Sequence, residues 1–593
     1  MNPTDTKKKI EKLRAFMSSN DLDAIIIPST DPHSGEYVPE YWESRKWISG
    51  FTGSAGTVVI TLHDAVLWTD SRYFLQAESQ LEGTGITLFK ERVSGTPSIT
   101  DWLINTLHKG DNVGIDGFVN TTSDALALKE ELSRGDIALV TIRDPFVGLW
   151  TDRPALPTNK PFILPIEYTG LSVQSKIEKI KEAYYRNGAD GILISALDEI
   201  AWTLNMRCND IHCNPVFISY LLISNNRTTL YMDSVKFTDE TRQHLTDNNI
   251  SIEEYKNIDN SLSSYSGYCL QMSPCTNFTL YSTATSTTKV VLCPSPVLYM
   301  KAVKNATEIE GFHNAMLRDG VAMVKFLIWI KEAVKAEQET ETSIERKLYQ
   351  LRSEQKNFRG LSFDTIAGYQ EHGAIVHYEA TEESAYTLKP KGMMLLDSGG
   401  QYTDGTTDIT RTIILGPIND EQKTDYTLVL KGMIDLAMAE FPEGTCGTQL
   451  DILARSAMWK NGINYGHGTG HGVGHFLNVH EGPHQIRMNH IPSPLLPGMT
   501  ITDEPGIYRT GKHGIRIENT MIVIPSQTTE FGNFFKFEPL TLCPIDKEGI
   551  RKEMLTDEEL TWFNNYHQYV FEKLNPLLNE DERRWLVSAT SAL

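Results

Sequence analysis

An internal repeat restricts the folds open to the first half of this chain. The segment KIEKLRAFMSSNDLDAIIIPS has a later counterpart, KIEKIKEAYYRNGADGILISA, and each has the pattern of an amphipathic helix followed by a buried strand. The strands start at Asp23-Ala24 and at Asp190-Gly191, an offset of 167 residues. Each copy continues into a strand hairpin, GTVVITLHDAVLWTDSR or YLLISNNRTTLYMDSVK, that ends in aspartate. The repeat predicts two similar α/β domains in tandem.

Proline-rich stretches mark where these domains end. TDRPALPTNKPFILP and CPSPVLYMKAVKN interrupt any regular element, because proline removes a backbone donor and fixes φ. We therefore predict one α/β domain over 1–155, a second over 156–298 and a third domain over 299–593. The expected fold class is mixed α/β.

The third domain has a different pattern, which begins with long helices. Thr307 with Glu310 fits a capping box before an apolar stripe at helical spacing, and Thr342 with Glu345 predicts a second helix start. Thr556 is followed by Glu559 and predicts a helical extension at the C-terminal end.

Charge and composition exclude several functions for the 593-residue chain. A net charge of −21 argues against a nucleic-acid partner, since phosphates require basic surfaces. No run reaches the ~18 apolar residues of a membrane span, and the charged N-terminus does not resemble a signal peptide. Seven scattered cysteines favour a reducing compartment. We expect a cytoplasmic protein with no membrane partner.

The stretch YGHGTGHGVGHFLNVHEGPH, residues 465–484, holds five histidines. Its last five residues match H-E-x-x-H, the zinc-protease motif, which needs both histidines on one helix face. Gly482 and Pro483 lie between them, and proline inside a helix costs about 3 kcal/mol. We therefore interpret the match as accidental. The glycines fit no nucleotide fingerprint and indicate close backbone approach.

Two further stretches supply carboxylates at strand ends. MLLDSGGQYTDGTTDITRTIIL carries Asp397 and Asp408, and MTITDEPGIYRTGKHGIRIENTMIVI carries Glu504 and Glu518. We expect Glu518 to lie inside a strand and to be buried, which is costly unless the carboxylate is paired or binds metal. Asp404, beside a glycine, is interpreted as a turn acid.

Any one of the four acids could equally be part of a salt bridge, but four acids beside a histidine cluster favour a metal centre. Four negative charges suit two divalent ions, and oxygen ligands with one imidazole favour Mn, Co, Fe or Zn. Two such ions hold a bridging hydroxide and polarise a carbonyl, which predicts amide or ester hydrolysis.

The motifs together resemble those of the "pita-bread" metallopeptidases. Within that family the chain is similar to the long, three-domain cytosolic X-prolyl aminopeptidases (aminopeptidase P). The resemblance spans nearly the whole chain and is carried by FTGSAGTVVIT, TDSRYFLQAE, SFDTIAGYQEHGAIVHY, LLDSGGQYTDGTTDITRT, YGHGTGHGVGHFLNVHEGP and ITDEPGIYRTGKHGIRIEN. It implies two creatinase-like N-terminal domains followed by a pita-bread catalytic domain.

The resemblance also implies a role for each candidate residue. The implied ligands of two divalent metal ions are Asp397, Asp408, His471, Glu504 and Glu518. Manganese is the metal expected from the family, and cobalt and zinc are the alternatives. The implied catalytic residues are His377, His480 and Glu504, and the implied substrate-binding residues are His377, His467, His480, Tyr508 and Arg516. His475 is expected to be structural and His484 a loop residue.

The implied activity is hydrolysis of the N-terminal Xaa-Pro bond of peptides by a metal-bridging hydroxide, in a homodimeric enzyme. Two alternatives remain open: an Xaa-Pro dipeptidase (prolidase), which would share the ligands but has one N-terminal domain, and a non-catalytic peptide-binding protein on the same fold.

Overall fold

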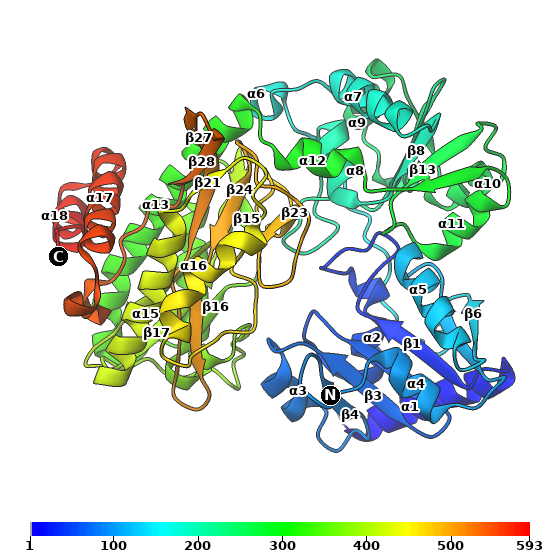
Figure 1. Cartoon of the computed structure of the whole chain (residues 1–593), viewed down its shortest axis with the longest axis horizontal. Helices are drawn as coiled ribbons and strands as arrows, with labels where there is room; N and C mark the ends of the chain where they lie inside the picture. The colour runs from blue at the N-terminus through cyan, green and yellow to red at the C-terminus, as the bar shows by residue number, and fades with distance from the viewer. Residues whose placement is uncertain (1–2) are drawn as a thin grey trace. The chain divides into compact units, whose positions relative to one another are not determined.

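The computed structural model describes residues 3–593, which form two compact units (Figure 1). The first unit runs from the N-terminus to Leu164 and includes Leu171–Val297. The second unit comprises Pro165–Gly170 and Leu298–Leu593. The predicted boundaries after residues 155 and 298 stay predictions.

The first unit contains two six-stranded sheets with matching topology. One sheet has the order β4-β3-β2-β1-β5-β6, and the other has the order β12-β11-β10-β8-β13-β14. The outermost strands are β4 (Thr87–Lys90), β6 (Ala138–Ile142), β12 (Ile250–Glu253) and β14 (Lys289–Leu292). In each, the strand after the first helix pairs antiparallel with the hairpin and parallel with a later strand. The elements that build the repeat are α1 (Pro3–Ser19), β1 (Ala24–Pro28), β2 (Thr57–Thr61), β3 (Ala65–Thr69) and β5 (Asn112–Asp116), then α7 (Val173–Arg186), β8 (Gly191–Ile194), β10 (Tyr220–Ser224), β11 (Thr228–Tyr231) and β13 (Cys269–Met272).

The first helix of each repeat packs into its domain through apolar residues on one face. Helix α1 buries Ile10, Leu13 and Met17 on one face, as helical spacing predicts. Helix α7 buries Ile177 and Ile180 in the second copy. The strand after each helix is buried almost throughout, so the sequence pattern of helix, buried strand and hairpin is confirmed.

The second unit surrounds two small antiparallel sheets with helices. The sheets have the orders β16-β17-β20 and β21-β28-β27-β24. The main elements are α13 (Ala306–Ala333), α14 (Glu341–Ser353), α15 (Asp420–Ala437) and α16 (Gly447–Trp459), with β16 (Ile366–Tyr369), β17 (Met393–Ser398), β20 (Ile409–Ile414), β21 (Glu440–Pro442), β24 (Thr500–Asp503), β27 (Asn519–Thr529) and β28 (Gly532–Pro539). The predicted C-terminal extension is helical, with α17 (Asp557–Leu574) and α18 (Glu580–Ala589) against α13 (Figure 1).

Helix α13 begins two residues earlier than predicted. The Asn305 side-chain oxygen accepts the backbone N–H of Thr307 and of Glu308, at 2.9 and 3.1 Å. The Glu308 carboxylate in turn accepts the Asn305 N–H at 3.0 Å. The predicted cap Thr307–Glu310 is therefore wrong. Two overlapping capping boxes compete in this sequence, and asparagine is the stronger N-cap.

The start of α14 is also corrected, whereas that of α17 is confirmed. Thr340, not Thr342, caps α14, and Ser343 takes the place expected for Glu345. Thr556 accepts the backbone N–H of Glu559, as predicted. The Ser343 hydroxyl accepts the backbone N–H of Thr340, as the glutamate of the usual capping box would. A pattern that requires glutamate at this position therefore misses the capping box of α14.

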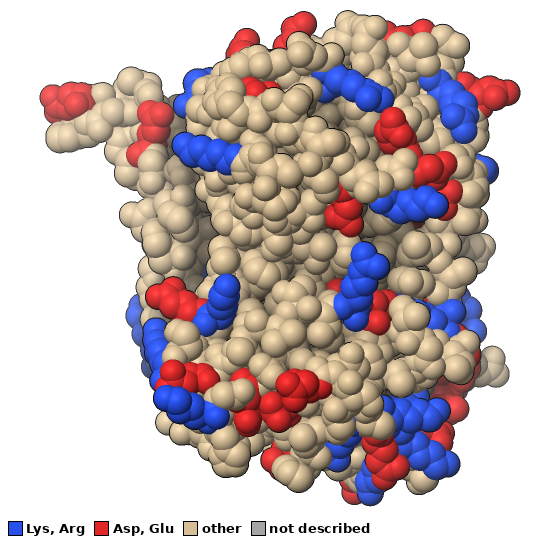
Figure 2. Space-filling view, turned by 90° about the vertical axis from the view of Figure 1, so that its right-hand side faces the viewer, with Lys and Arg blue, Asp and Glu red and all other residues tan. Residues whose placement is uncertain are grey.

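Among residues 3–593, no helix is long and apolar enough to cross a bilayer. On the face in Figure 2, lysine and arginine side chains lie among aspartate and glutamate, without an extended basic patch.

Candidate metal centre

Paired strands bring the first two predicted ligands together. Asp397 lies near the end of β17, which pairs antiparallel with β20. Asp408 directly precedes β20, and Thr410 stands opposite Asp397 in the ladder. Both carboxylates are buried. The sequence prediction that these acids lie at strand ends on a common sheet is therefore consistent with the structure.

Glu518 is buried as predicted but does not lie inside a strand. It follows β26 (His513–Arg516) and precedes β27, and its residue is 1% exposed. Its backbone N–H donates to Thr410 O at 3.0 Å, and its carboxylate accepts the Thr410 hydroxyl at 2.8 Å. The run IRIENTMIVI looks continuous, but its two halves pair with different strands.

His471 is presented by the short strand β22 (Gly470–Gly472). Its Nδ1–H donates to Gly472 O at 2.9 Å, so Nε2 carries the lone pair that would bind a metal. Nε2 lies 3.5 Å from carboxylate oxygens of both Asp408 and Glu504. A Cβ on Gly470 would meet Thr502 O at 1.9 Å, so the predicted close backbone approach is confirmed there.

Glu504 completes the set from the residue after β24. Its backbone N–H donates to Thr469 O at 2.8 Å, which ties it to the histidine stretch. Its carboxylate accepts a 3.4 Å contact from the Thr502 hydroxyl. Glu504 therefore faces the same space as His471.

The electrostatics of this cluster fit bound cations. Ligand atoms of Asp408, His471 and Glu518 all lie within 4.8 Å of one another. Burial raises the pKa of Asp408 and of Glu518 well above the usual range, and the neighbouring carboxylates add to the rise. Burial also raises the pKa of Glu504 to about 7. Within the described chain, Asp397 Oδ1 is buried with no hydrogen-bond donor. Divalent cations would satisfy these charges.

A hydrogen-bonded chain leads from Asp397 to His467. Arg516 donates through Nε and Nη2 to Asp397 Oδ2, at 3.1 and 2.6 Å, and through Nη1 to the Tyr508 hydroxyl at 2.7 Å. Tyr508 and His467 Nε2 are 2.8 Å apart, and His467 Nδ1–H donates to Gly468 O. Because Nδ1 carries the proton, Nε2 accepts the tyrosine O–H.

The remaining predicted residues lie beside the ligands. The rings of His480 and His471 meet edge to face, with centroids 4.4 Å apart. His377 follows Val376, whose carbonyl oxygen lies 3.5 Å from Arg516 Nη2. The structure thus brings His480 against the candidate ligand His471 and places the residue before His377 next to Arg516.

The two histidines outside the predicted site are both structural. His475 is buried and packs edge to face on Phe312, as expected. His484 is not a loop residue: it is fully buried in β23 (Glu481–Ile486), and Nε2–H donates to Thr500 O at 2.7 Å. Burial lowers its pKa to about 4. The strand through this segment confirms that H-E-x-x-H is accidental.

Comparison with known proteins decides the family. Metallopeptidase family M24 matches residues 310–525, and its C-terminal region matches 533–593. The creatinase/prolidase N-terminal domain matches twice, at 9–145 and 152–308. Xaa-Pro aminopeptidase 1 of Dictyostelium discoideum is 41% identical over 99% of this chain and 96% of its own length. The chain belongs to the Xaa-Pro aminopeptidases of family M24.

Solved structures of this family agree with the fold. X-prolyl aminopeptidase of Caenorhabditis elegans, described as a cytosolic enzyme with a di-nuclear active site, is 35% identical with a TM-score of 0.95 and full coverage of both chains. Xaa-Pro dipeptidase of Bacillus anthracis is 25% identical with a TM-score of 0.51, covering 63% of this chain and 99% of its own. Two creatinase-like domains and a pita-bread domain are confirmed.

Sequence reasoning missed a buried pair that holds the histidine stretch. Arg455 on α16 donates to the carbonyl oxygens of Tyr465 and His467, at 2.7 and 2.9 Å, and to Asp451 at 2.6 Å. Asp451 also accepts the Thr469 hydroxyl at 2.5 Å. In the sequence, Asp451 and Arg455 are opposite charges four residues apart in a largely apolar helix, and this pattern could have indicated the pair.

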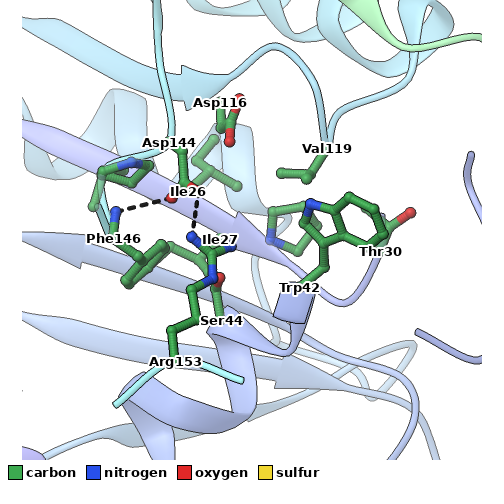
Figure 3. Close-up of a pocket in the computed structure, with 13 residues that line it drawn as sticks. Ile26, Ile27, Thr30, Trp42, Ser44, Asp116, Val119, Asp144, Phe146 and Arg153 are labelled. Atoms are coloured by element: carbon green, nitrogen blue, oxygen red, sulfur yellow. Dashed lines mark hydrogen bonds and ion pairs between the residues drawn. The ribbon is translucent and has the colours of Figure 1, made fainter. Parts of the chain in front are cut away.

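A small cavity in the first unit lies near Trp42, Asp116 and Arg153 (Figure 3). Its volume is about 20 Å³, room for about one water molecule. Arg153 forms an ion pair with Asp144 at its edge. The cavity is too small for a peptide, so it is not a second substrate site of the aminopeptidase fold.

Proposed function

We propose that this protein is a metal-dependent Xaa-Pro aminopeptidase that removes the first residue of peptides with proline in second position. The observation that carries the proposal is the cluster of four carboxylates and one imidazole, in a chain that matches Xaa-Pro aminopeptidases over nearly its whole length. Three of the carboxylates are buried, and Glu504 and His471 are partly buried. The proposed ligands are Asp397, Asp408, His471, Glu504 and Glu518.

The proposed ligands hold two divalent ions. When bound, such ions supply a hydroxide-like nucleophile at neutral pH and polarise the scissile carbonyl. Manganese is the proposed native metal, and the same oxygen-rich set accepts cobalt or zinc. Metal analysis of protein purified without added metal, by mass spectrometry, tests this choice: two manganese ions per chain support it.

The chain's own residues would handle the proton and the peptide. Glu504, which lies beside His471 at the centre, would manage the proton of the nucleophile during attack on the amide. His480 and His377 would hydrogen-bond the scissile amide and its tetrahedral intermediate. Tyr508 and Arg516 would orient His467 against the substrate and Asp397 against the metal.

The deciding experiment compares two peptides. The protein is stripped with a chelator, and cleavage of an Xaa-Pro-Yaa tripeptide and an Xaa-Pro dipeptide is followed with and without manganese. Metal-restored release of Xaa from the tripeptide, with the dipeptide intact, supports the proposal. Cleavage of the dipeptide alone would make the protein a prolidase instead. Failure to cleave either, with no metal bound, would support the non-catalytic alternative.

We further propose a cytoplasmic homodimer. All seven cysteines are free in the structure, which fits a reducing compartment. Light scattering coupled to gel filtration tests the dimer, since the chain has a mass of 66.8 kDa. Twice that mass supports the proposal, and a single-chain mass contradicts it.

A further inference from the structure

A buried ion cluster lies next to the histidine proposed for catalysis. The Glu481 carboxylate accepts Lys301 Nζ at 2.9 Å, and its other oxygen accepts Lys304 Nζ. All three side chains are at most 1% exposed. Lys304 also donates to the Lys301 carbonyl at 2.8 Å. Two ammonium groups thus converge on one carboxylate in the protein interior.

The cluster joins two segments that are far apart in the sequence. Lys301 belongs to α12 (Pro296–Ala302), and Lys304 lies just before α13. Glu481 is the first residue of β23 and directly follows His480. Burial lowers the pKa of Lys304, while the charges of Glu481 and Glu308 oppose that shift. Burying such ions is costly, so the cluster adds little net stability and is better explained by geometric specificity.

The backbone before His480 is a loop without regular secondary structure. Residues 473–480 contain no helix or strand, and Phe476 adopts a positive φ of 47°. This loop is held at Val473 by Thr500 and at Leu477 by Gln401, each three or more residues before His480. Glu481, held by two buried ion pairs, lies directly after His480 and fixes this end of the loop.

Glu481 is also the point where the strand ladder shifts register. His471 pairs with Gln485, but the next residue, Gly472, pairs with Glu481, so three residues bulge out of the ladder. Bulges beside active sites re-aim side chains. The clamped residue thus pairs next to the proposed ligand His471 and is covalently joined to His480, whose ring contacts that ligand.

We propose that Lys301, Lys304 and Glu481 form a positioning clamp that holds the His480 imidazole at the metal centre. The inference rests on the proposed function, because His480 acts on the bound peptide only if the protein is the aminopeptidase. The clamp residues are not among the proposed ligands or substrate-binding residues, and their side chains are buried. Loss of the clamp should therefore reduce turnover while leaving metal and peptide binding nearly unchanged.

Glu481→Gln tests the clamp, because glutamine keeps the shape of the side chain and removes its charge. We expect kcat to fall at least tenfold, with KM within about threefold and two metal ions still bound. The matched control is Glu559→Gln, which breaks a partly buried lysine–glutamate pair with Lys431 between α15 and α17. The control should lower the melting temperature without changing kcat.

A second variant is available if Glu481→Gln does not fold. Lys301→Met removes one ammonium group and leaves the Lys304–Glu481 pair, and it should show the same separation of kcat from KM, with a threefold to tenfold fall in kcat. Unchanged kcat in both variants, or a fall that only tracks lost metal, would overturn the clamp. If wild-type protein cleaves no Xaa-Pro peptide, the proposed function itself fails.

Discussion

At the scale of single residues, the Tyr508 hydroxyl joins two parts of the proposed site. It accepts from Arg516, which holds the ligand Asp397, and it donates to His467 Nε2. We expect Tyr508→Phe to bind two metals but to lose about tenfold in kcat/KM, because His467 loses its orienting partner. Steady-state kinetics with metal analysis measures both. The exposed Tyr349→Phe is the control, and equal kinetics in the two variants would contradict the role.

A buried histidine predicts how stability depends on pH. His567 Nε2 accepts the Ile545 N–H at 3.0 Å, and burial lowers the pKa of this ring to about 3. Below about pH 6.5, His567 therefore binds a proton in the unfolded chain but not in the folded chain. Stability is fully present above that pH and is lost as pH falls towards 3.

His567→Gln should flatten this dependence, because glutamine can accept the same N–H but does not titrate. Between pH 6 and 4 the free energy of unfolding of metal-free protein should fall less steeply, by up to about 1.4 kcal/mol per pH unit. Urea unfolding across this range measures the slope. The exposed His490→Gln should keep the wild-type slope, and a wild-type slope in His567→Gln would refute the assignment.

At the scale of elements, glycines set how closely strands approach the metal centre. A Cβ on Gly470 would lie 1.9 Å from Thr502 O, where only backbone could move. We expect Gly470→Ala to displace β22 from β24 and to lose at least one metal ion per chain, measured by equilibrium dialysis. Gly468→Ala is the control, since its nearest contacts lie at 3.6 Å. Full metal content in Gly470→Ala would contradict this.

Helix and strand ends show how far sequence reasoning reaches. Residue types at fixed spacing identified the repeat and the cap at Thr556, whereas the ligand candidates came from the family resemblance and stay a prediction. They missed the cap at Asn305, where two overlapping boxes differ only in cap strength. They also misplaced Glu518 and His484, because strand pairing and burial depend on neighbours distant in the chain. A local sequence pattern does not specify which strand a segment pairs with.

At the scale of the whole molecule, two compact units predict two thermal transitions. All candidate ligands lie in the unit that contains Leu298–Leu593. Metal at 100 times its dissociation constant stabilises by about 2.7 kcal/mol, or roughly 4 °C for a unit of this size. Calorimetry with and without chelator should therefore move one transition only.

The control for this experiment is a reductant. All seven cysteines are free, so dithiothreitol should shift neither transition. A single transition that moves as a whole with chelator would show instead that the two units unfold together.

The spread of the ligands along the chain has a consequence for biogenesis. The candidate ligands Asp397, Asp408, His471, Glu504 and Glu518 come from three separate stretches of the chain. Hydrogen bonds between these stretches bring them together. A growing chain that has not yet produced β26 lacks Glu518 and cannot assemble the centre. Metal capture is therefore a late event that marks completion of the domain, so the ion cannot act as a nucleus for its folding.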